Sequence, residues 1–187
     1  YRGLVEALRA NDPARFLYTV EFFPEEGKYH YDGHRKCGVV SAPRESLRTN
    51  DLCPRCGKKL TIGVAHRVEE LADREPGQGP AGGVPFKNLI PLNELIAEAV
   101  GKTPECQGVW DLYFHFVREF GDEHAILTEV PVAELARVAP ERVAEAVDRM
   151  RRGQVRVEPG HDGEYGTVRV FGGEAAAEAC TPQLSLF

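Results

Sequence analysis

The chain has 187 residues, which is enough for one domain or two small ones with a modest core. No apolar run is long enough to cross a membrane and no charged-then-apolar leader points to secretion, so we expect a cytoplasmic protein. The net charge of −6 is unevenly spread, because residues 28–67 carry nine Lys or Arg and only three Asp or Glu. Such a local basic segment is typical of a surface that faces phosphates.

The first predicted elements are a helix and a strand. Apolar residues recur with helical spacing in residues 1–11, and the following Asp-Pro pair ends this helix. Residues 16–23 are rich in aromatic and β-branched side chains and predict a strand. Because the chain begins with Tyr1 and not with Met, we expect that the parent protein has an upstream part.

Residues 34–38 and 53–57 are two copies of one short pattern: a potential metal ligand, two spacers, a cysteine and a glycine. The spacing lets both ligands of a pair face one ion across a tight turn, and the glycine lets backbone amides approach the thiolates. Fifteen residues separate the two pairs, which is within the range of zinc-ribbon-like sites. Four ligands make a closed, structural site that stabilises a region without a core of its own. The predicted ligands of this Zn²⁺ site are His34, Cys37, Cys53 and Cys56.

Two alternatives remain open for this region. His30 could replace His34 as the histidine ligand, although only His34 keeps the spacing of the pattern. Reduced thiols on surface turns next to a histidine would need no metal at all. A redox centre is disfavoured, because a redox Cys-x-x-Cys pair opens a helix and does not face a second ligand pair.

Basic and aromatic side chains are interleaved in and around the two ligand pairs. Lys and Arg can neutralise phosphates and aromatic rings can stack on an unpaired base, so we expect this region to contact DNA. The alternative is a solvated basic face, and for His66 and Arg67 an ordinary helix surface is an equally good explanation. The candidate DNA contacts are Lys28, Tyr29, His30, Tyr31, Arg35, Lys36, Arg55, Lys58, Lys59, His66 and Arg67.

The remainder of the chain predicts a helical region and a terminal hairpin. Residues 64–74 have helical spacing, and the four glycines and two prolines in residues 75–83 predict a loop or linker. Further apolar periodicity predicts four helices, the last two separated at Pro140, and alternating residues around a Gly/Asp-rich turn predict two strands. The predicted helices are residues 92–100, 107–120, 132–138 and 141–152, and the strands are residues 155–158 and 167–171.

The last residues carry a second motif. Residues 172–182 contain no amphipathic run that could fold back on a core, so we expect residues 172–187 to be a flexible tail. The final pentapeptide resembles the Gln-Leu-x-Leu-Phe motif with which bacterial DNA-processing enzymes dock on the replicative sliding clamp. The resemblance implies that the glutamine amide binds the rim of the clamp pocket and the apolar side chains fill it; a chance match is the alternative. The candidate clamp-binding residues are Gln183, Leu184, Ser185, Leu186 and Phe187.

These elements predict an α+β fold. A connector helix and strand precede a small zinc-ribbon-like module with its following helix, and a linker joins that module to a helical region that ends in a β-hairpin and a flexible tail. The sequence shows no Ser-His-Asp arrangement, no phosphate-binding glycine loop and no second histidine–carboxylate cluster that would hold catalytic metals, so we assign no catalytic residue. The predicted segments are 1–27, 28–74, 75–91, 92–171 and 172–187.

Long stretches of this sequence resemble endonuclease Q and its relatives. The residues that carry the resemblance are 16–38 (FLYTVEFFPEEGKYHYDGHRKCG), 53–57 (CPRCG), 63–72 (GVAHRVEELA) and 159–166 (PGHDGEYG). The resemblance implies a DNA-repair endonuclease that recognises deaminated bases, such as uracil or hypoxanthine, and nicks the strand beside them. In that family catalysis belongs to a metal-binding PHP domain, of the polymerase and histidinol phosphatase type, that precedes the zinc module. The histidine and aspartate ligands of that domain have no counterpart in this sequence.

We therefore expect the C-terminal, zinc-binding and DNA-contacting part of a bacterial, clamp-tethered repair endonuclease that is associated with the nucleoid. Its expected partners are DNA with deaminated or damaged bases and the sliding clamp, and it has no membrane partner. A non-catalytic, zinc-dependent DNA-binding or clamp-adaptor protein is the alternative. A structural zinc module in a protein assembly that never touches DNA is the third hypothesis.

Overall fold

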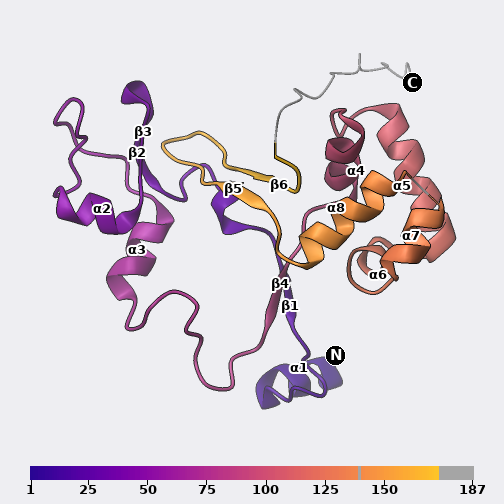
Figure 1. Cartoon of the computed structure of the whole chain (residues 1–187). Helices are drawn as coiled ribbons and strands as arrows, with labels where there is room; N and C mark the ends of the chain where they lie inside the picture. The colour runs from indigo at the N-terminus through magenta and orange to yellow at the C-terminus, as the bar shows by residue number, and fades with distance from the viewer. Residues whose placement is uncertain (139, 173–187) are drawn as a thin grey trace. The chain divides into compact units, whose positions relative to one another are not determined.

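The computed structural model describes residues 1–138 and 140–172, and the chain divides into two compact units. Unit 1 comprises Tyr1–Asn88 and Glu158–Thr167, and unit 2 comprises Leu89–Val157 and, among the described residues, the chain from Val168 to Gly172. Helices and small two-stranded sheets both occur (Figure 1), which is consistent with the predicted α+β class. Among the described residues, none of the helices is long and apolar enough to cross a membrane.

Unit 1 is built from short elements joined by turns and loops (Figure 1). Its elements are α1 (Arg2–Ala10), β1 (Thr19–Glu21), the 3-10 turn η1 (Pro24–Glu26), β2 (Asp32–His34), the 3-10 turn η2 (Arg35–Cys37), β3 (Val39–Ser41), α2 (Pro43–Arg48), α3 (Val64–Leu71) and β4 (Phe86–Asn88). Strands β1 and β4 run parallel, with Thr19 opposite Phe86. Strands β2 and β3 are antiparallel, with Asp32 opposite Ser41. Asp32 and His34 are thus both held on a paired strand.

The apolar core around the cysteines is small. It consists of the buried residues Val39, Cys53 and Leu60, with Cys37 packed against them. A cluster of this size buries too little apolar area to offset the conformational entropy of the turns around it, so such modules are usually held by a metal or by disulfides. The small core fits the expectation that this region depends on a ligated ion.

Unit 2 is a helical region with a well-packed interior. Its helices are α4 (Leu92–Val100), α5 (Gln107–Phe120), α6 (Glu123–Thr128), α7 (Val132–Val138) and α8 (Glu141–Arg151). The hairpin strands β5 (Arg156–Glu158) and β6 (Thr167–Arg169) follow, and the hairpin tip from Glu158 to Thr167 belongs to unit 1. Helix α4 packs against α5 and α8, and α7 packs against α8. Leu95, Ile96, Phe116, Leu135 and Val147 from these four helices are fully buried. Unit 2 thus has a larger apolar core than the region around the cysteines.

Most of the predicted elements are confirmed. The helices predicted at residues 92–100, 107–120 and 132–138 have the expected bounds, and the other predicted helices differ by one to three residues at their ends. The predicted strand 16–23 is shorter, because only β1 pairs with a neighbouring strand. Helices α2 and α6, of six residues each, were not predicted, since such short segments carry no measurable periodicity. Strand β4 lies inside the predicted linker 75–91.

Candidate metal centre and adjoining surface

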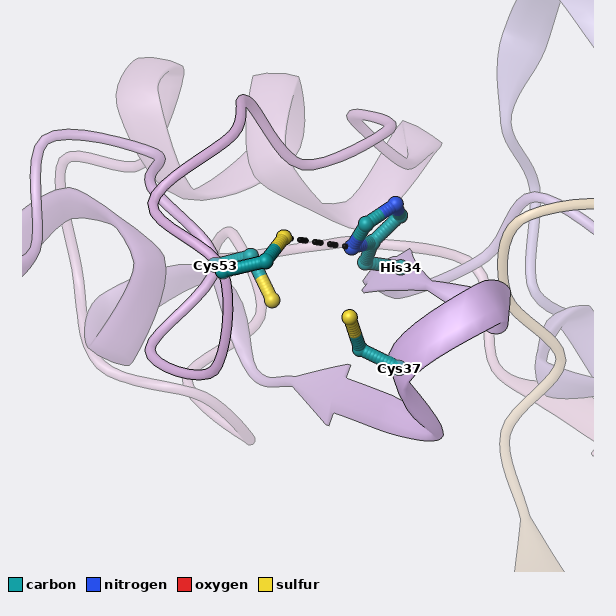
Figure 2. Close-up of side chains that lie close together, drawn as sticks. His34, Cys37 and Cys53 are labelled. Atoms are coloured by element: carbon teal, nitrogen blue, oxygen red, sulfur yellow. Dashed lines mark hydrogen bonds between the residues drawn. The ribbon is translucent and has the colours of Figure 1, made fainter.

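The two ligand pairs of the sequence come together in unit 1. His34 ends β2, Cys37 ends η2, and Cys53 and Cys56 lie on the turn that follows α2. One ligand atom from each of the four residues lies within 4.8 Å of the others. The Nδ1 atom of His34 is 3.3 Å from the Sγ atom of Cys56. Figure 2 shows His34, Cys37 and Cys53 turned toward a common space.

Two glycines shape the turns that carry the ligands. Gly38 and Gly57 have φ values of 59° and 69°, in the left-handed region that favours glycine. The Gly38 amide donates to the Arg35 carbonyl, and the Gly57 amide donates to the Cys53 carbonyl, at 2.9 and 2.8 Å. Each turn therefore closes on itself and brings its two ligands to one side.

The donor set of this cluster fits Zn²⁺. Three thiols and one imidazole are a common zinc ligand set, and tetrahedral Zn–S and Zn–N bonds place neighbouring ligand atoms roughly 3.5–3.8 Å apart. The four ligand atoms here lie within 4.8 Å of one another, a spacing that small movements would bring to that geometry. His30, the alternative histidine, is not part of the cluster; its ring stacks on Tyr31 with centroids 5.3 Å apart. The four residues can thus hold a metal ion, and the donor set is consistent with zinc.

Electrostatics within the cluster also favour a bound cation. Burial raises the pKa of the Cys53 thiol, but hydrogen bonds from the His34 ring and from backbone amides outweigh it and lower the pKa to about 6. A hydrogen bond with Cys56, together with burial and the nearby Cys53 and Cys56 thiols, raises the pKa of the Cys37 thiol to about 11. One thiol therefore ionises readily while a neighbour resists ionisation. A divalent cation among them removes that conflict, because it stabilises every thiolate at once.

The tip of the β5–β6 hairpin supports the first ligand pair, a contact that the sequence did not predict. Asp162 Oδ2 accepts the backbone N–H of Arg35 at 2.6 Å, and its Oδ1 accepts the hydroxyl of Thr61 at 2.6 Å. These two hydrogen bonds lower the pKa of the Asp162 carboxyl, and the bond from Thr61 has the larger effect. Arg35 begins η2, the turn that carries Cys37, so Asp162 fixes the backbone between the ligands His34 and Cys37.

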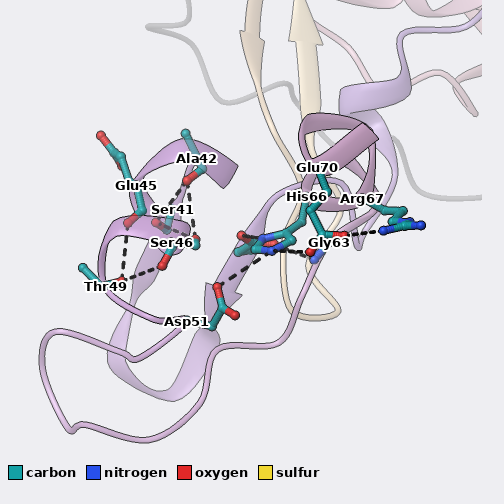
Figure 3. Close-up of polar contacts among 11 residues, drawn as sticks. Ser41, Ala42, Glu45, Ser46, Thr49, Asp51, Gly63, His66, Arg67 and Glu70 are labelled. Carbon is teal, nitrogen blue, oxygen red and sulfur yellow. Dashed lines mark hydrogen bonds and ion pairs between the residues drawn. The ribbon is translucent and has the colours of Figure 1, made fainter. Parts of the chain in front are cut away.

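His66, a candidate DNA contact from the sequence, is buried and 5% exposed. Its Nδ1 atom lies 2.7 Å from Oδ2 of Asp32, whose Oδ1 accepts the Gly63 amide at 2.7 Å. Its Nε2 atom lies 3.9 Å from carboxylate oxygens of both Asp51 and Glu70 (Figure 3). The Asp32 hydrogen bond outweighs burial and raises the pKa of His66. We therefore remove His66 from the candidate DNA contacts: it joins α3 to β2.

The other candidate DNA contacts lie at or near the surface of unit 1. His30 and Tyr31 are half-buried, and Arg67 is exposed but donates to Glu70 at 2.7 Å. The remaining candidates are exposed: Lys28, Tyr29, Arg35, Lys36, Arg55, Lys58 and Lys59. The candidate clamp-binding residues, 183–187, lie outside the described residues.

Comparison with known proteins gives sequence relatives over most of the chain. A family model described as the MJ0043 C-terminal domain matches residues 91–154. The uncharacterized protein MJ0043 of Methanocaldococcus jannaschii is 34% identical over 145 residues, which cover 78% of this chain and 18% of that protein. The uncharacterized protein YqxK of Bacillus subtilis is 27% identical over 164 residues, which cover 87% of this chain and 38% of that protein. The chain thus spans well under half the length of either relative.

Comparison with solved structures connects the chain to a nuclease. It is similar to the crystal structure of the lesion-specific endonuclease PfuEndoQ from Pyrococcus furiosus, with 34% identity and a TM-score of 0.70 over 81% of this chain and 37% of that one. It is also similar, at 34% identity and a TM-score of 0.66, to endonuclease Q in complex with a 27-mer duplex substrate that has an abasic lesion at the active site. These likenesses support an endonuclease Q-like relationship, as the sequence resemblance implied.

Proposed function

We propose that this chain is the C-terminal part of a bacterial endonuclease Q-type DNA-repair enzyme, in which it contacts DNA through a zinc-stabilised module. The similarity to PfuEndoQ, at 34% identity and a TM-score of 0.70 across 81% of the chain, is the observation that carries this proposal. Identity at this level over most of the chain supports common ancestry and not the fold alone. The parent enzyme acts on the nucleoid and nicks DNA beside deaminated bases.

The metal in this proposal is a structural Zn²⁺ ion. His34, Cys37, Cys53 and Cys56 would hold it, and four protein ligands leave no open position for a water or a substrate. When bound, zinc would cross-link the two turns that carry the ligands and so stabilise a region that has only a small apolar core. Cutting is then the work of a PHP domain of the parent enzyme, and no residue of this chain is assigned a catalytic role.

The DNA contact in this proposal is electrostatic. Lys28, Arg35, Lys36, Lys58 and Lys59 all have exposed side chains in the unit that contains the cysteines. Ammonium and guanidinium groups in such positions neutralise phosphates and release counterions, which gives binding that weakens steeply with salt. Because the metal cluster holds the turns on which several of these residues lie, zinc and DNA binding should depend on each other.

The charge reversal of Lys58 and Lys59 tests the DNA contact. With both changed to Glu, the affinity of the zinc-loaded chain for a uracil-containing duplex should fall, and the slope of log K against log salt should flatten by about two, one for each lost phosphate contact. Fluorescence anisotropy across a salt series measures both quantities. The control is Lys87→Glu, on β4 outside the candidate set. An unchanged slope in the double variant would show that the two lysines form only a solvated face.

The tether in this proposal is the pentapeptide at residues 183–187, whose support is its sequence alone. It would dock on the bacterial sliding clamp, with the glutamine at the pocket rim and the leucines and phenylalanine inside. Deletion of these five residues should abolish binding to the clamp in a pull-down or anisotropy assay while zinc content and DNA affinity stay unchanged. Clamp binding that survives the deletion would contradict the tether.

A further inference from the structure

Two exposed tyrosines flank a lysine on the surface of unit 1. Tyr29 and Tyr165 are 46% and 74% exposed, which is high for rings of this size. The Nζ atom of Lys28 lies 5.7 Å from the ring centroid of Tyr29 and 5.6 Å from that of Tyr165. The two rings come from the segment before β2 and from the tip of the β5–β6 hairpin, so only the folded chain brings them together.

The hairpin tip that carries Tyr165 is firmly held in unit 1. The Gly163 amide donates to the Lys28 carbonyl at 2.9 Å, and the Gly166 amide donates to the Glu26 carbonyl at 3.0 Å. A Cβ atom added at Gly160 would lie 2.5 Å from the Gly27 carbonyl oxygen, so the two backbones touch. Tyr165 is therefore displayed on an ordered turn, which lowers the entropy cost of using it in binding.

A second cation lies near the Tyr29 hydroxyl and the hairpin tip. A Cβ atom added at Gly163 would lie 3.7 Å from the Tyr29 hydroxyl and 3.8 Å from a guanidinium nitrogen of Arg35. Glu164, an exposed acidic side chain of the tip, lies 3.7 Å from Nε2 of His161. The surface formed by Lys28, Tyr29, Arg35 and Tyr165, which we call the tyrosine surface, thus combines two aromatic rings with two positive charges.

We propose that the tyrosine surface binds an unpaired nucleobase of DNA together with its flanking phosphates. A base can stack on an exposed phenol ring whatever its identity, and the lysine and arginine can neutralise the adjacent phosphates. An apolar peptide or a lipid tail would leave both cations without a partner, so an anionic aromatic ligand matches the surface better. This inference rests on the proposed function, because it specifies which part of DNA the module holds: a base outside the duplex stack.

A pair of duplexes tests this inference with the full, zinc-loaded chain. One duplex carries a single bulged 2-aminopurine, and the other has the same sequence with that base paired. Stacking on a tyrosine ring quenches 2-aminopurine fluorescence. We expect the wild-type chain to quench the bulged probe and to bind it more tightly than the paired duplex.

Substitutions of the two tyrosines give the decisive comparison. Tyr165→Ala and Tyr29→Ala should each weaken binding of the bulged probe about tenfold, lose the quenching, and leave affinity for the paired duplex within about twofold. Tyr165→Phe should retain both signals, because it keeps the ring. The control is Phe22→Ala, which removes an aromatic side chain of the same unit that is 71% exposed, close to the exposure of Tyr165. Zinc content and circular dichroism confirm that each variant is folded.

The possible results separate this inference from the proposed function. If Tyr165→Ala loses no more affinity for the bulged probe than Phe22→Ala does, while the wild-type chain binds DNA, the tyrosine surface is not a base site and the proposed DNA contact stands. Equal losses on bulged and paired duplexes would also overturn the inference, because they indicate a backbone contact. If the wild-type chain binds neither duplex at any salt concentration, the DNA contact in the proposed function fails, and this inference fails with it.

Discussion

Asp162 is the residue at which three distant segments of the chain meet. Its carboxylate accepts hydrogen bonds from the Arg35 amide of η2 and from the Thr61 hydroxyl, while its own backbone lies in the hairpin tip. It also adopts a φ of 42°, a left-handed conformation that Asp and Asn tolerate better than most residues. Nothing in the local sequence links Asp162 to the metal ligands, since the contact depends on how the hairpin folds back.

Replacement of Asp162 by Asn should weaken zinc binding about tenfold, because mutation of residues that position metal ligands typically lowers metal affinity by at least that factor. The amide suits the left-handed backbone, but it carries no negative charge, so both hydrogen bonds lose their charged acceptor and weaken, and the Thr61 hydroxyl must turn to accept from the NH₂ group. Competition with a chromophoric zinc chelator measures the affinity. Glu164→Gln, on the same tip, is the matched control and should stay within about twofold of wild type; a similar result for Asp162→Asn would show that Asp162 does not position the ligands.

His66 should make the stability of unit 1 depend on pH. Its pKa is raised in the folded chain by Asp32, so the folded state holds the proton more tightly than the unfolded state, whose value is near 6.5. The stabilising contribution is therefore complete below pH 6.5 and is lost as the pH rises through the raised pKa. His66→Asn keeps a neutral N–H donor for Asp32 but cannot titrate.

The measurement is the free energy of unfolding of wild type and His66→Asn from pH 6.5 upward, with zinc kept saturating so that ligand protonation does not contribute. The advantage of the wild type over the variant should shrink as the pH rises. A difference that is constant over this range would mean that His66 is neutral in the folded chain and contributes only by packing.

At the scale of the elements, the two units differ in how much their sequence reveals. Helices α4, α5 and α7 were predicted with the observed bounds because each packs one apolar stripe on a common core. The helical spacing of residues such as Leu92, Leu95 and Ile96 makes such a stripe recognisable in the sequence. In unit 1 strand β1 is held by a partner far away in the sequence, β4, whereas β2 pairs with its sequence neighbour β3. Local patterns could therefore locate β1 but not its length or its neighbour.

The start of α3 depends on a close backbone approach at Gly63. A Cβ atom there would lie 2.5 Å from the Tyr31 carbonyl oxygen, and the Gly63 amide is the donor to the buried Asp32. Gly63→Ala should lower the free energy of unfolding by about 1–3 kcal/mol, as overpacking usually does. Gly108→Ala is the control, since a Cβ atom there meets no heavy atom within 4 Å and Ala favours the helix. Thermal unfolding compares them, and equal melting temperatures would contradict the close approach.

At the scale of the whole molecule, the sequence predicted the His/Cys cluster, which could hold a metal ion, but only part of the surface around it. The spacing of His34, Cys37, Cys53 and Cys56 was sufficient, because a metal site imposes its own short-range pattern. Three of the four residues of the tyrosine surface, Lys28, Tyr29 and Arg35, were predicted as DNA contacts because they lie among basic residues near the cysteines. Tyr165 was not predicted, because only the fold of the hairpin brings it next to Lys28. Contacts between distant segments leave no periodic or spacing signal, and this limits what one sequence can show.

The central claim is that a metal-held module of an endonuclease Q relative contacts DNA. The most direct test is to measure zinc content and affinity for a uracil-containing duplex on the same preparation, before chelation, after chelation and after zinc is restored. We predict about one Zn²⁺ per chain, DNA binding that is lost on chelation, and recovery of both when zinc returns. A chain that contains no zinc and binds DNA equally well with and without the chelator would contradict the account.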